Sequence, residues 1–178
     1  MATAPLALAL AACSGGGEDA APAPENLLES LGDVDLNDPD LVITDELRAS
    51  LPDRLVSEKF IEIFYDRNDL VAGFERWVHP DYIQHDPNSP TGRDATIAVL
   101  AAHMERNPQM THDVKRVIYG EDDQGRTLVA VHYHFKRAPD DRGSAVVDIY
   151  RIENGYLVEH WDVIQPVPET ARNDNTMF

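Results

Sequence analysis

The sequence lacks the features that mark several common classes of protein. It has one cysteine, so no disulfide can form within the chain, and it has 15 lysines and arginines against 32 aspartates and glutamates. The resulting net charge of -17 would repel nucleic acids and anionic membrane surfaces, so we expect neither as a partner. No stretch provides the roughly 20 apolar residues of a membrane-spanning helix. Glycine-rich phosphate loops, the G-x-S-x-G nucleophile motif and paired CxxC motifs are also absent.

The acidity is concentrated near the N-terminus. Residues 18–47 hold ten acids and no base, which leaves 22 acids against 15 bases, a net charge of -7, for the rest of the chain. The preceding stretch MATAPLALALAACSGGG resembles a bacterial lipoprotein signal, in which a short apolar run ends at the cysteine that becomes lipidated. We therefore expect a signal peptide over residues 1–12, lipidation of Cys13 and a flexible acidic tether over residues 13–50. The alternative is a disordered N-terminus with a free cysteine.

The remaining residues, 51–178, have the pattern of one α+β domain. Apolar residues at helical spacing predict two consecutive helices within residues 52–80, and a third helix is predicted within residues 93–108. From residue 112 onward the period changes to that of strands. Four β-rich runs separated by DQG, PDDRG and NG indicate an antiparallel meander that follows the helices.

Three stretches make the resemblance to a known family specific: YIQHDPNSPTGRDA after the second helix, DRGSAVVDIYRIENGYLVEHWDVIQPVPE in the last hairpin, and the terminal NTMF. Together with the order of elements, they resemble the SnoaL-like branch of the nuclear transport factor 2-like superfamily. The resemblance implies a conical fold in which N-terminal helices pack on a curved antiparallel sheet. This fold serves cyclases, isomerases, dehydratases, epoxide hydrolases and plain binding proteins, so the fold alone does not give the function.

The last hairpin carries polar side chains whose direction depends on the register of its two strands. A two-residue Asn154-Gly155 loop would place Asp148 opposite Trp161, whereas a three-residue loop that includes Glu153 would place Asp148 opposite His160. We favour the three-residue loop. It puts four polar residues on the face that lines a cavity and the apolar residues on the other face. The first set is Asp148, Tyr150, His160 and Asp162, and the second is Val147, Ile149, Leu157, Trp161 and Val163.

Three further histidines are candidates for the same cavity. His132 and His134 share one face of the strand VHYHF, and the resemblance places the polar face of this strand inside the cone. His85, in YIQHD, lies where residues of the resembling enzymes line the mouth of the pocket. The alternative is that His132 and His134 form a solvated surface and that His85 is structural. We expect no chemical role for His79, His103 and His112.

The resemblance to SnoaL-like polyketide cyclases implies a chemistry for these residues. A buried aspartate has its pKa raised by desolvation and can exchange a proton near neutral pH. By position this base is Asp148, and we expect His134 to be its donor or orienting partner, which requires both side chains on one face of the sheet. Asp162 corresponds to an acid of the limonene epoxide hydrolases, but a histidine replaces the second acid there. The expected site has two sets of residues: Asp148, His134, Asp162 and His85 for catalysis, and His132, Tyr150, His160 and Tyr82 for ligand contact.

The predicted function is cofactor-free acid/base chemistry on a small carbonyl compound, either an aldol-type cyclisation or an isomerisation. The alternative is a lipoprotein that binds a small ligand in the same pocket without turnover. His132 and His134 with His85 or Asp148 could ligate zinc or iron, but the resembling proteins usually work without metal, so we expect none. We expect a lipid-anchored protein of the bacterial cell envelope. We also expect a homodimer, because the faces with Val129, Val131, Tyr133 and Phe135 and with Leu157, Trp161 and Val163 are too apolar for exposure to water.

Overall fold

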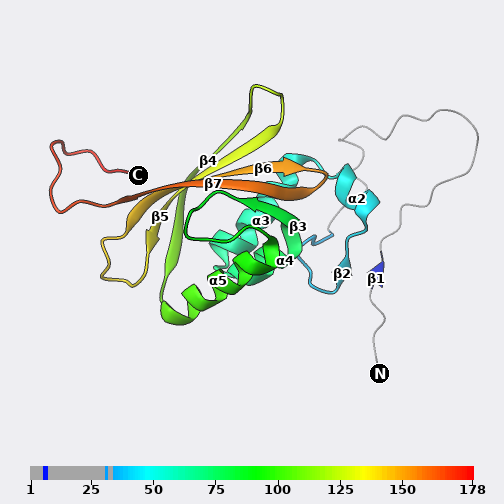
Figure 1. Cartoon of the computed structure of the whole chain (residues 1–178), viewed down its shortest axis with the longest axis horizontal. Helices are drawn as coiled ribbons and strands as arrows, with labels where there is room; N and C mark the ends of the chain where they lie inside the picture. The colour runs from blue at the N-terminus through cyan, green and yellow to red at the C-terminus, as the bar shows by residue number, and fades with distance from the viewer. Residues whose placement is uncertain (1–5, 8–30, 32–33) are drawn as a thin grey trace, which may run out of the picture.

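A computed structural model of the chain describes residues 6–7, 31 and 34–178. Cys13 and most of the expected signal peptide therefore lie outside the described residues. The helices and strands follow the predicted order, with helices first and the strand meander afterwards (Figure 1). The helical elements are α2 (Asp45–Ser50), α3 (Asp53–Ile61), the π-helix η1 (Glu62–Asp66), α4 (Leu70–Trp77) and α5 (Arg93–Arg106). The strands are β1 (Leu6–Ala7), β2 (Leu41–Val42), β3 (Val78–Gln84), β4 (Thr111–Glu121), β5 (Thr127–Lys136), β6 (Ser144–Glu153) and β7 (Tyr156–Pro166).

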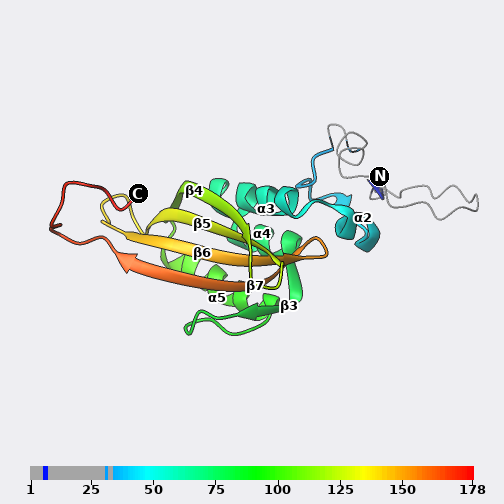
Figure 2. The same cartoon turned by 90° about the horizontal axis from the view of Figure 1, so that it is seen from above.

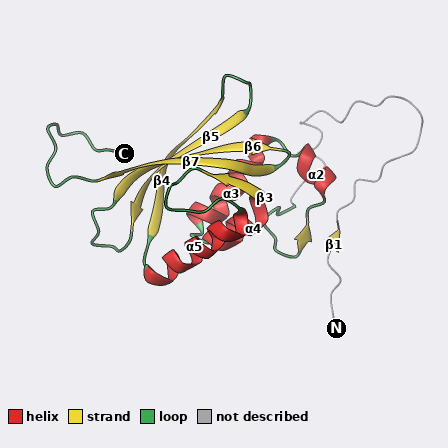
Figure 3. Cartoon of the chain, in the orientation of Figure 1, coloured by secondary structure: helices red, strands yellow, loops and turns green. Residues whose placement is uncertain are grey.

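The main sheet has five strands in the order β3-β7-β6-β5-β4. Strands β4 to β7 form the predicted antiparallel meander, and β3 adds a parallel edge strand beside β7. Helices α3, α4 and α5 lie below this sheet in Figure 1 and behind it in Figure 2, where the curve of the strands is visible. Figure 3 shows the same separation into a helical layer and a strand layer. The α+β class predicted from the sequence is thereby confirmed.

The core fills the space between the helices and the concave face of the sheet. Val129, Val131 and Tyr133 of β5 and Leu157 of β7 point into it and are almost fully buried. From the sequence, these side chains were expected on an outer apolar face that would need a partner protomer. That assignment is wrong, because alternation along β5 directs Val129, Val131 and Tyr133 against the helices and leaves the intervening histidines outside.

The helical layer reaches the sheet through a widened turn. Three successive residues of η1, Ile63, Phe64 and Tyr65, are buried, which a regular α-helix with its 100° rotation per residue does not easily allow. Helix α4 packs closely on this turn, since a Cβ atom on Gly73 would lie 3.0 Å from Cβ of Phe64. The wide turn thus directs Tyr65 toward the centre of the sheet.

The packed part of the chain begins before residue 51. Leu36, Leu41 and Leu47 are buried in the core, although the sequence analysis placed them in the tether. The guanidinium group of Arg76 donates hydrogen bonds to the carbonyl oxygens of Leu36 and Leu41, and so fastens this segment to α4. None of the helices in the described residues has the length and apolarity needed to cross a membrane.

The hairpin between β6 and β7 closes with the two-residue loop, not with the three-residue loop that we favoured. Asn154 and Gly155 have φ angles of 51° and 76°, as a type I′ turn requires, and Ile152 pairs with Leu157. A bulge follows at Val158, so that Arg151 pairs with Glu159. The bulge moves all later residues of β7 by one position.

The bulge restores the predicted polar face by a different route. Beyond it, Tyr150 pairs with His160 and Asp148 pairs with Asp162, and directly paired residues share a face. Asp148, Tyr150, His160 and Asp162 therefore point to the same side, as expected. Leu157 had been assigned to the opposite face, but it precedes the bulge and is fully buried in the core.

Candidate active site

A cavity of about 420 Å³ lies between the concave face of the sheet and the helices. Its walls come from η1, α4, α5, the segment after β3 and strands β4 to β7. Four predicted site residues line it, namely Asp148, Tyr150, His160 and Asp162. Phe64, Leu70, Phe74, Leu100, Phe135 and Val146 supply much of the apolar wall. An apolar cavity of this size with a few convergent polar groups is typical of a small-molecule site.

Asp148 is the most buried acid of this site, with 5% of its surface exposed. The hydroxyl of Tyr65 donates a hydrogen bond of 2.6 Å to Oδ2 of Asp148, and the hydroxyl of Tyr150 lies 3.3 Å from the same oxygen. The two tyrosine hydroxyls are also 2.8 Å apart. Burial and the neighbouring carboxylate raise the pKa of both tyrosines well above the usual value, so the two hydroxyls remain protonated donors.

His160 lies on the other side of the carboxylate. Its Nε2 is 3.4 Å from Oδ1 of Asp148, and its Nδ1 is 2.8 Å from Oε1 of Gln84. The same Oε1 accepts a hydrogen bond of 3.0 Å from the backbone N–H of Asp86, which fixes the amide orientation of Gln84. Nδ1 of His160 must therefore carry a hydrogen. Nε2 of His160 faces Oδ1 of Asp148, so a hydrogen on this nitrogen would point toward the carboxylate.

Two of the three acids that line the cavity, Asp148 and Asp162, have pKa values displaced in opposite directions. Burial acts to raise the pKa of Asp148, but His160, Tyr65 and Tyr133 outweigh it and hold this pKa below the usual value. The expectation of a raised pKa for Asp148 is therefore wrong. The pKa of Asp162 is raised by burial, by Asp86 and by Asp148.

Tyr82, predicted to contact the ligand, lies next to the cavity and does not line it. Its side chain is fully buried, and its ring stacks on that of His160 with centroids 6.4 Å apart. Its hydroxyl has no hydrogen-bond partner among the described residues. Tyr82 thus supports the imidazole of His160 from behind.

The structure brings His112 and His103 into the cavity wall, although the sequence analysis gave neither a chemical role. Nδ1 of His112 donates a 2.6 Å hydrogen bond to Oδ1 of Asn68, whose Nδ2 is engaged with a backbone carbonyl. Burial lowers the pKa of His112 to about 4. His112 is therefore a neutral side chain near pH 7. His103 lies near a helix end and His112 follows a turn, so the sequence gave no sign that either residue would line the cavity.

His134 and His132 do not face the cavity. His134 donates from Nε2 to the carbonyl oxygen of Arg142 at 2.8 Å, and its ring stacks on Phe178 with centroids 4.2 Å apart. Nδ1 of His132 accepts a 2.7 Å hydrogen bond from Arg116. Because the inward residues of β5 alternate with these histidines, His134 and Asp148 lie on opposite faces of the sheet and cannot exchange a proton. The assignment of His134 as partner of Asp148 is wrong, and the enzyme hypothesis built on this pair fails. An enzyme hypothesis for this cavity has to be built anew on Asp148 and His160.

His85 is also outside the cavity. Its ring stacks on Trp161 with centroids 4.9 Å apart and an interplanar angle of 5°, and its Nε2 is 2.9 Å from Oε1 of Glu159. The residues on either side of it, Gln84 and Asp86, line the cavity instead. The prediction that this segment reaches the cavity was therefore correct, but the choice of His85 as the residue that lines it was wrong.

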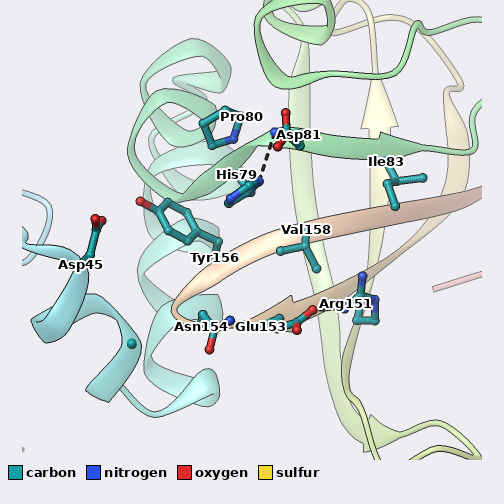
Figure 4. A pocket seen from close by; sticks show the side chains of 11 residues that line it. Asp45, His79, Pro80, Asp81, Ile83, Arg151, Glu153, Asn154, Tyr156 and Val158 are labelled. Carbon is teal, nitrogen blue, oxygen red and sulfur yellow. Dashed lines mark hydrogen bonds and ion pairs between the residues drawn. The ribbon is translucent and has the colours of Figure 1, made fainter.

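A larger hollow of about 610 Å³ lies away from this site, between α2, the start of β3 and the β6–β7 turn (Figure 4). His79, Tyr156 and Arg151 contribute to it, and the close-up shows them around an open space with Asp45 of α2 at its edge. The guanidinium of Arg151 is already paired with Glu153 and Glu159. This hollow contains none of the predicted site residues and no buried acid, so we place the chemistry in the smaller cavity.

No group of three or more His, Cys, Asp or Glu side chains that could hold a metal ion occurs in the part of the chain that the structure describes. The polar side chains around the cavity form hydrogen bonds with one another, as in those of Tyr65 to Asp148 and of His160 to Gln84.

Comparison with known proteins identifies a family. Residues 57–160, more than half of the chain, match the model of the SnoaL-like domain. No curated protein matches the sequence.

Three solved structures are among those similar to this chain. IdmH, a candidate polyketide cyclase from Streptomyces antibioticus, is 21% identical, with a TM-score of 0.45 over 61% of this chain and 91% of its own. TsrD from Streptomyces laurentii is 17% identical, with a TM-score of 0.47 over 64% and 90%. A candidate isomerase of the SnoaL-like family from Agrobacterium tumefaciens is 8% identical, with a TM-score of 0.48 over 64% and 97%.

Proposed function

The chain belongs to the SnoaL-like domain family, and from this premise we propose that it is an enzyme that performs cofactor-free acid/base chemistry on a small carbonyl compound. The reaction would begin with removal of a proton α to a carbonyl group and end in an aldol-type ring closure or an isomerisation. The observation that supports this most is the buried pair of Asp148 and His160, which line the cavity together with Tyr150. Tyr65, which does not line the cavity, donates a hydrogen bond to Asp148.

Asp148 is the base of the proposed reaction. One of its oxygens takes the α proton, the electron pair of the C–H bond forms the enolate double bond, and the negative charge moves to the carbonyl oxygen. Nε2 of His160 makes no short hydrogen bond within the described residues, and when it carries a proton its N–H can donate to that oxygen. Protonated Asp148 then returns its proton, either to another carbon of the enolate or to the alkoxide formed by attack on a second carbonyl.

A binding protein with the same cavity is the second candidate. The lowered pKa of Asp148 favours it, because a weaker base removes an α proton more slowly. The tyrosine and histidine donors around the carboxylate would serve ligand recognition equally well. The two candidates therefore differ in turnover and not in the shape of the site.

Proton exchange separates these candidates. The probe is 1-phenylbutane-1,3-dione in D₂O, and the measured quantity is the rate of loss of its α protons by NMR. An enzyme should raise this rate above that of the buffer. Asp148→Asn should reduce the gain at least ~100-fold while binding of the probe persists, because general base catalysis contributes about 10² to 10⁴ in rate. Asp140→Asn, at an exposed loop position, is the control and should change neither quantity. Binding to the parent without faster exchange would favour the binding protein.

We also propose that Cys13 carries a lipid that holds the domain at the bacterial cell envelope. The support is the apolar run that ends in Leu10-Ala11-Ala12 before Cys13, followed by a serine and three glycines. Cys13→Ala should release the full chain into the soluble fraction and abolish labelling by a fatty-acid analogue. A parent protein that takes up no label would contradict the proposal.

A further inference from the structure

Two arginines at the rim of the cavity form no ion pair among the described residues. The backbone N–H of one of them, Arg137, donates to Oδ2 of Asp141, and the charge of Arg137 helps to lower the pKa of that carboxyl group. Arg106 is the last residue of α5 and Arg137 follows the end of β5, and both line the cavity. Neither guanidinium is paired with a carboxylate among the residues that the structure describes. Most basic residues of this acidic chain do have such partners, namely Arg54, Lys59, Arg67, Arg93, Lys115, Arg126, Arg142 and Arg151.

The two arginines converge on one part of the rim. The guanidinium of Arg137 lies 5.8 Å from the ring centroid of Phe135, and the ring of His103 lies 5.8 Å from the same centroid. Arg106 follows His103 by three residues on α5, so their side chains lie on the same face of the helix. The pKa of His103 is lowered by burial and then by Arg106 and Arg137, which indicates a positive potential at this rim.

The position of Arg106 at a helix C-terminus has an ordinary explanation, because a cation there interacts favourably with the helix dipole. The same explanation does not apply to Arg137, which comes from the loop after a strand. The acids that face the cavity lie elsewhere, on β6, on β7 and on the segment after β3; they are Asp148, Asp162 and Asp86. The lining of the cavity therefore has a cationic side and an acidic side.

We propose that the ligand of this cavity is a carboxylate, which binds Arg106 and Arg137 while its uncharged carbonyl part reaches Asp148. The second half of this statement rests on the proposed function. A planar guanidinium can bind both oxygens of a carboxylate, which makes such a pair stronger and more selective than a single neutral hydrogen bond. A cavity of about 420 Å³ accommodates a small aromatic or aliphatic keto acid.

The test compares a keto acid with its neutral ester. The probes are 4-oxo-4-phenylbutanoate and its methyl ester, and the dissociation constant of each is measured on the full chain by ligand-observed NMR. The parent should bind the carboxylate at least about 10-fold more tightly than the ester, as a charge-assisted pair of hydrogen bonds predicts. In Arg106→Gln/Arg137→Gln this preference should disappear while the affinity for the ester stays the same.

The matched control is Arg172→Gln. Arg172 also has no ion pair among the described residues, but it lies in the C-terminal segment and does not line the cavity, so its loss should leave the preference intact. In the ligand-free double variant the pKa of His103, followed by NMR, should rise. Equal binding of acid and ester, no binding of the acid to the parent, or an unchanged preference in the double variant would overturn the proposal.

This result can be separated from the fate of the proposed function. Preferential binding of the carboxylate requires no turnover, so it should persist in Asp148→Asn. A preference for the carboxylate without proton exchange would therefore support the carboxylate subsite and reject the enzyme. Proton exchange without this preference would support the enzyme and reject the carboxylate subsite.

Discussion

The side-chain oxygen of Gln84 lies 2.8 Å from Nδ1 of His160 and fixes which nitrogen of the imidazole faces Asp148. Gln84 itself is held by the backbone N–H of Asp86, so the amide cannot flip without the loss of a hydrogen bond. Gln84 is thus a positioning residue of the proposed reaction. It touches neither Asp148 nor, in the proposed step, the reacting atoms.

The first prediction follows from this contact. Gln84→Leu removes the acceptor of Nδ1, so the ring of His160 is no longer held in one orientation. We expect the proton exchange activity to fall by at least about 10-fold, the lower end of the cost of losing a group that orients a functional histidine in metal sites. Long-range ¹⁵N–¹H NMR of His160 should show the loss of the hydrogen bond at Nδ1, which a general loss of stability would not produce. Gln84→Glu keeps an acceptor and should keep this hydrogen bond, and Gln109→Leu at an exposed position is the control.

A second prediction concerns Tyr65. Its hydroxyl donates the shortest hydrogen bond that Asp148 receives, at 2.6 Å. Tyr65→Phe should destabilise the fold by about 1.5–3 kcal/mol, the range for a hydrogen bond to a charged group, and should raise the pKa of Asp148. Urea denaturation and NMR titration of the carboxyl carbon measure these quantities. Tyr119→Phe, which removes a hydroxyl without a hydrogen-bond partner among the described residues, should alter neither.

The sequence was informative where one local pattern decides the geometry. Strand alternation and polarity were sufficient to place Asp148, Tyr150, His160 and Asp162 on one face. They could not give the strand register, because Val158 and Glu159 fit a regular strand as well as a bulge. Only the packing of Leu157 in the core requires the extra residue of the bulge. For this reason the predicted face of these four residues was correct, but the predicted pairing of β6 with β7 was wrong.

Which face of β5 points toward the core could not be predicted, for a different reason. Its two faces carry apolar residues on one side and His132 and His134 on the other, and both assignments are compatible with alternation. The cavity with its few polar groups occupies only part of the concave face, and the rest is core, so β5 turns its apolar side inward. The contact of Tyr65 with Asp148 spans 83 residues of sequence. No local pattern contains it.

Histidine 112 provides a prediction about pH. Its pKa is about 4 in the folded protein and about 6.5 in a model peptide, because burial disfavours the charged ring. Between these values the unfolded chain binds a proton that the folded chain does not. The stability due to neutral His112 is therefore complete above pH 6.5 and is lost as the pH falls toward 4, by up to about 3 kcal/mol.

Urea denaturation at pH 7.5 and pH 4.5 tests this sign. The parent should lose more stability between the two values than His112→Gln, in which the titrating group is absent. Asp148 adds a further loss only at lower pH, because its folded pKa lies below the usual value and its contribution disappears as that pKa is crossed. An equal loss in parent and variant would contradict a buried neutral His112.

The last prediction concerns the turn that sets the register of the site. Gly155 has a φ of 76°, in the left-handed region, and a Cβ atom at this position would collide with the backbone oxygen of Arg48. The carbonyl of Gly155 also accepts a hydrogen bond of 3.3 Å from the guanidinium of Arg48, whose carbon lies 4.2 Å from the ring centroid of Tyr156. Helix α2 is thereby fastened to the β6–β7 turn.

Gly155→Ala should therefore cost more than the roughly 1 kcal/mol that a left-handed alanine costs by itself. Gly125→Ala is the matched control, because Gly125 has a φ of 73° but no atom within 4 Å of the added Cβ. The free energy of unfolding in urea should fall by about 1 kcal/mol for Gly125→Ala and by at least about 2 kcal/mol for Gly155→Ala, since the second change also displaces α2. Equal losses in the two variants would mean that the contact with Arg48 does not hold the turn. A larger loss for Gly155→Ala, accompanied by weaker proton exchange, would show that this turn keeps Asp148 and His160 in register.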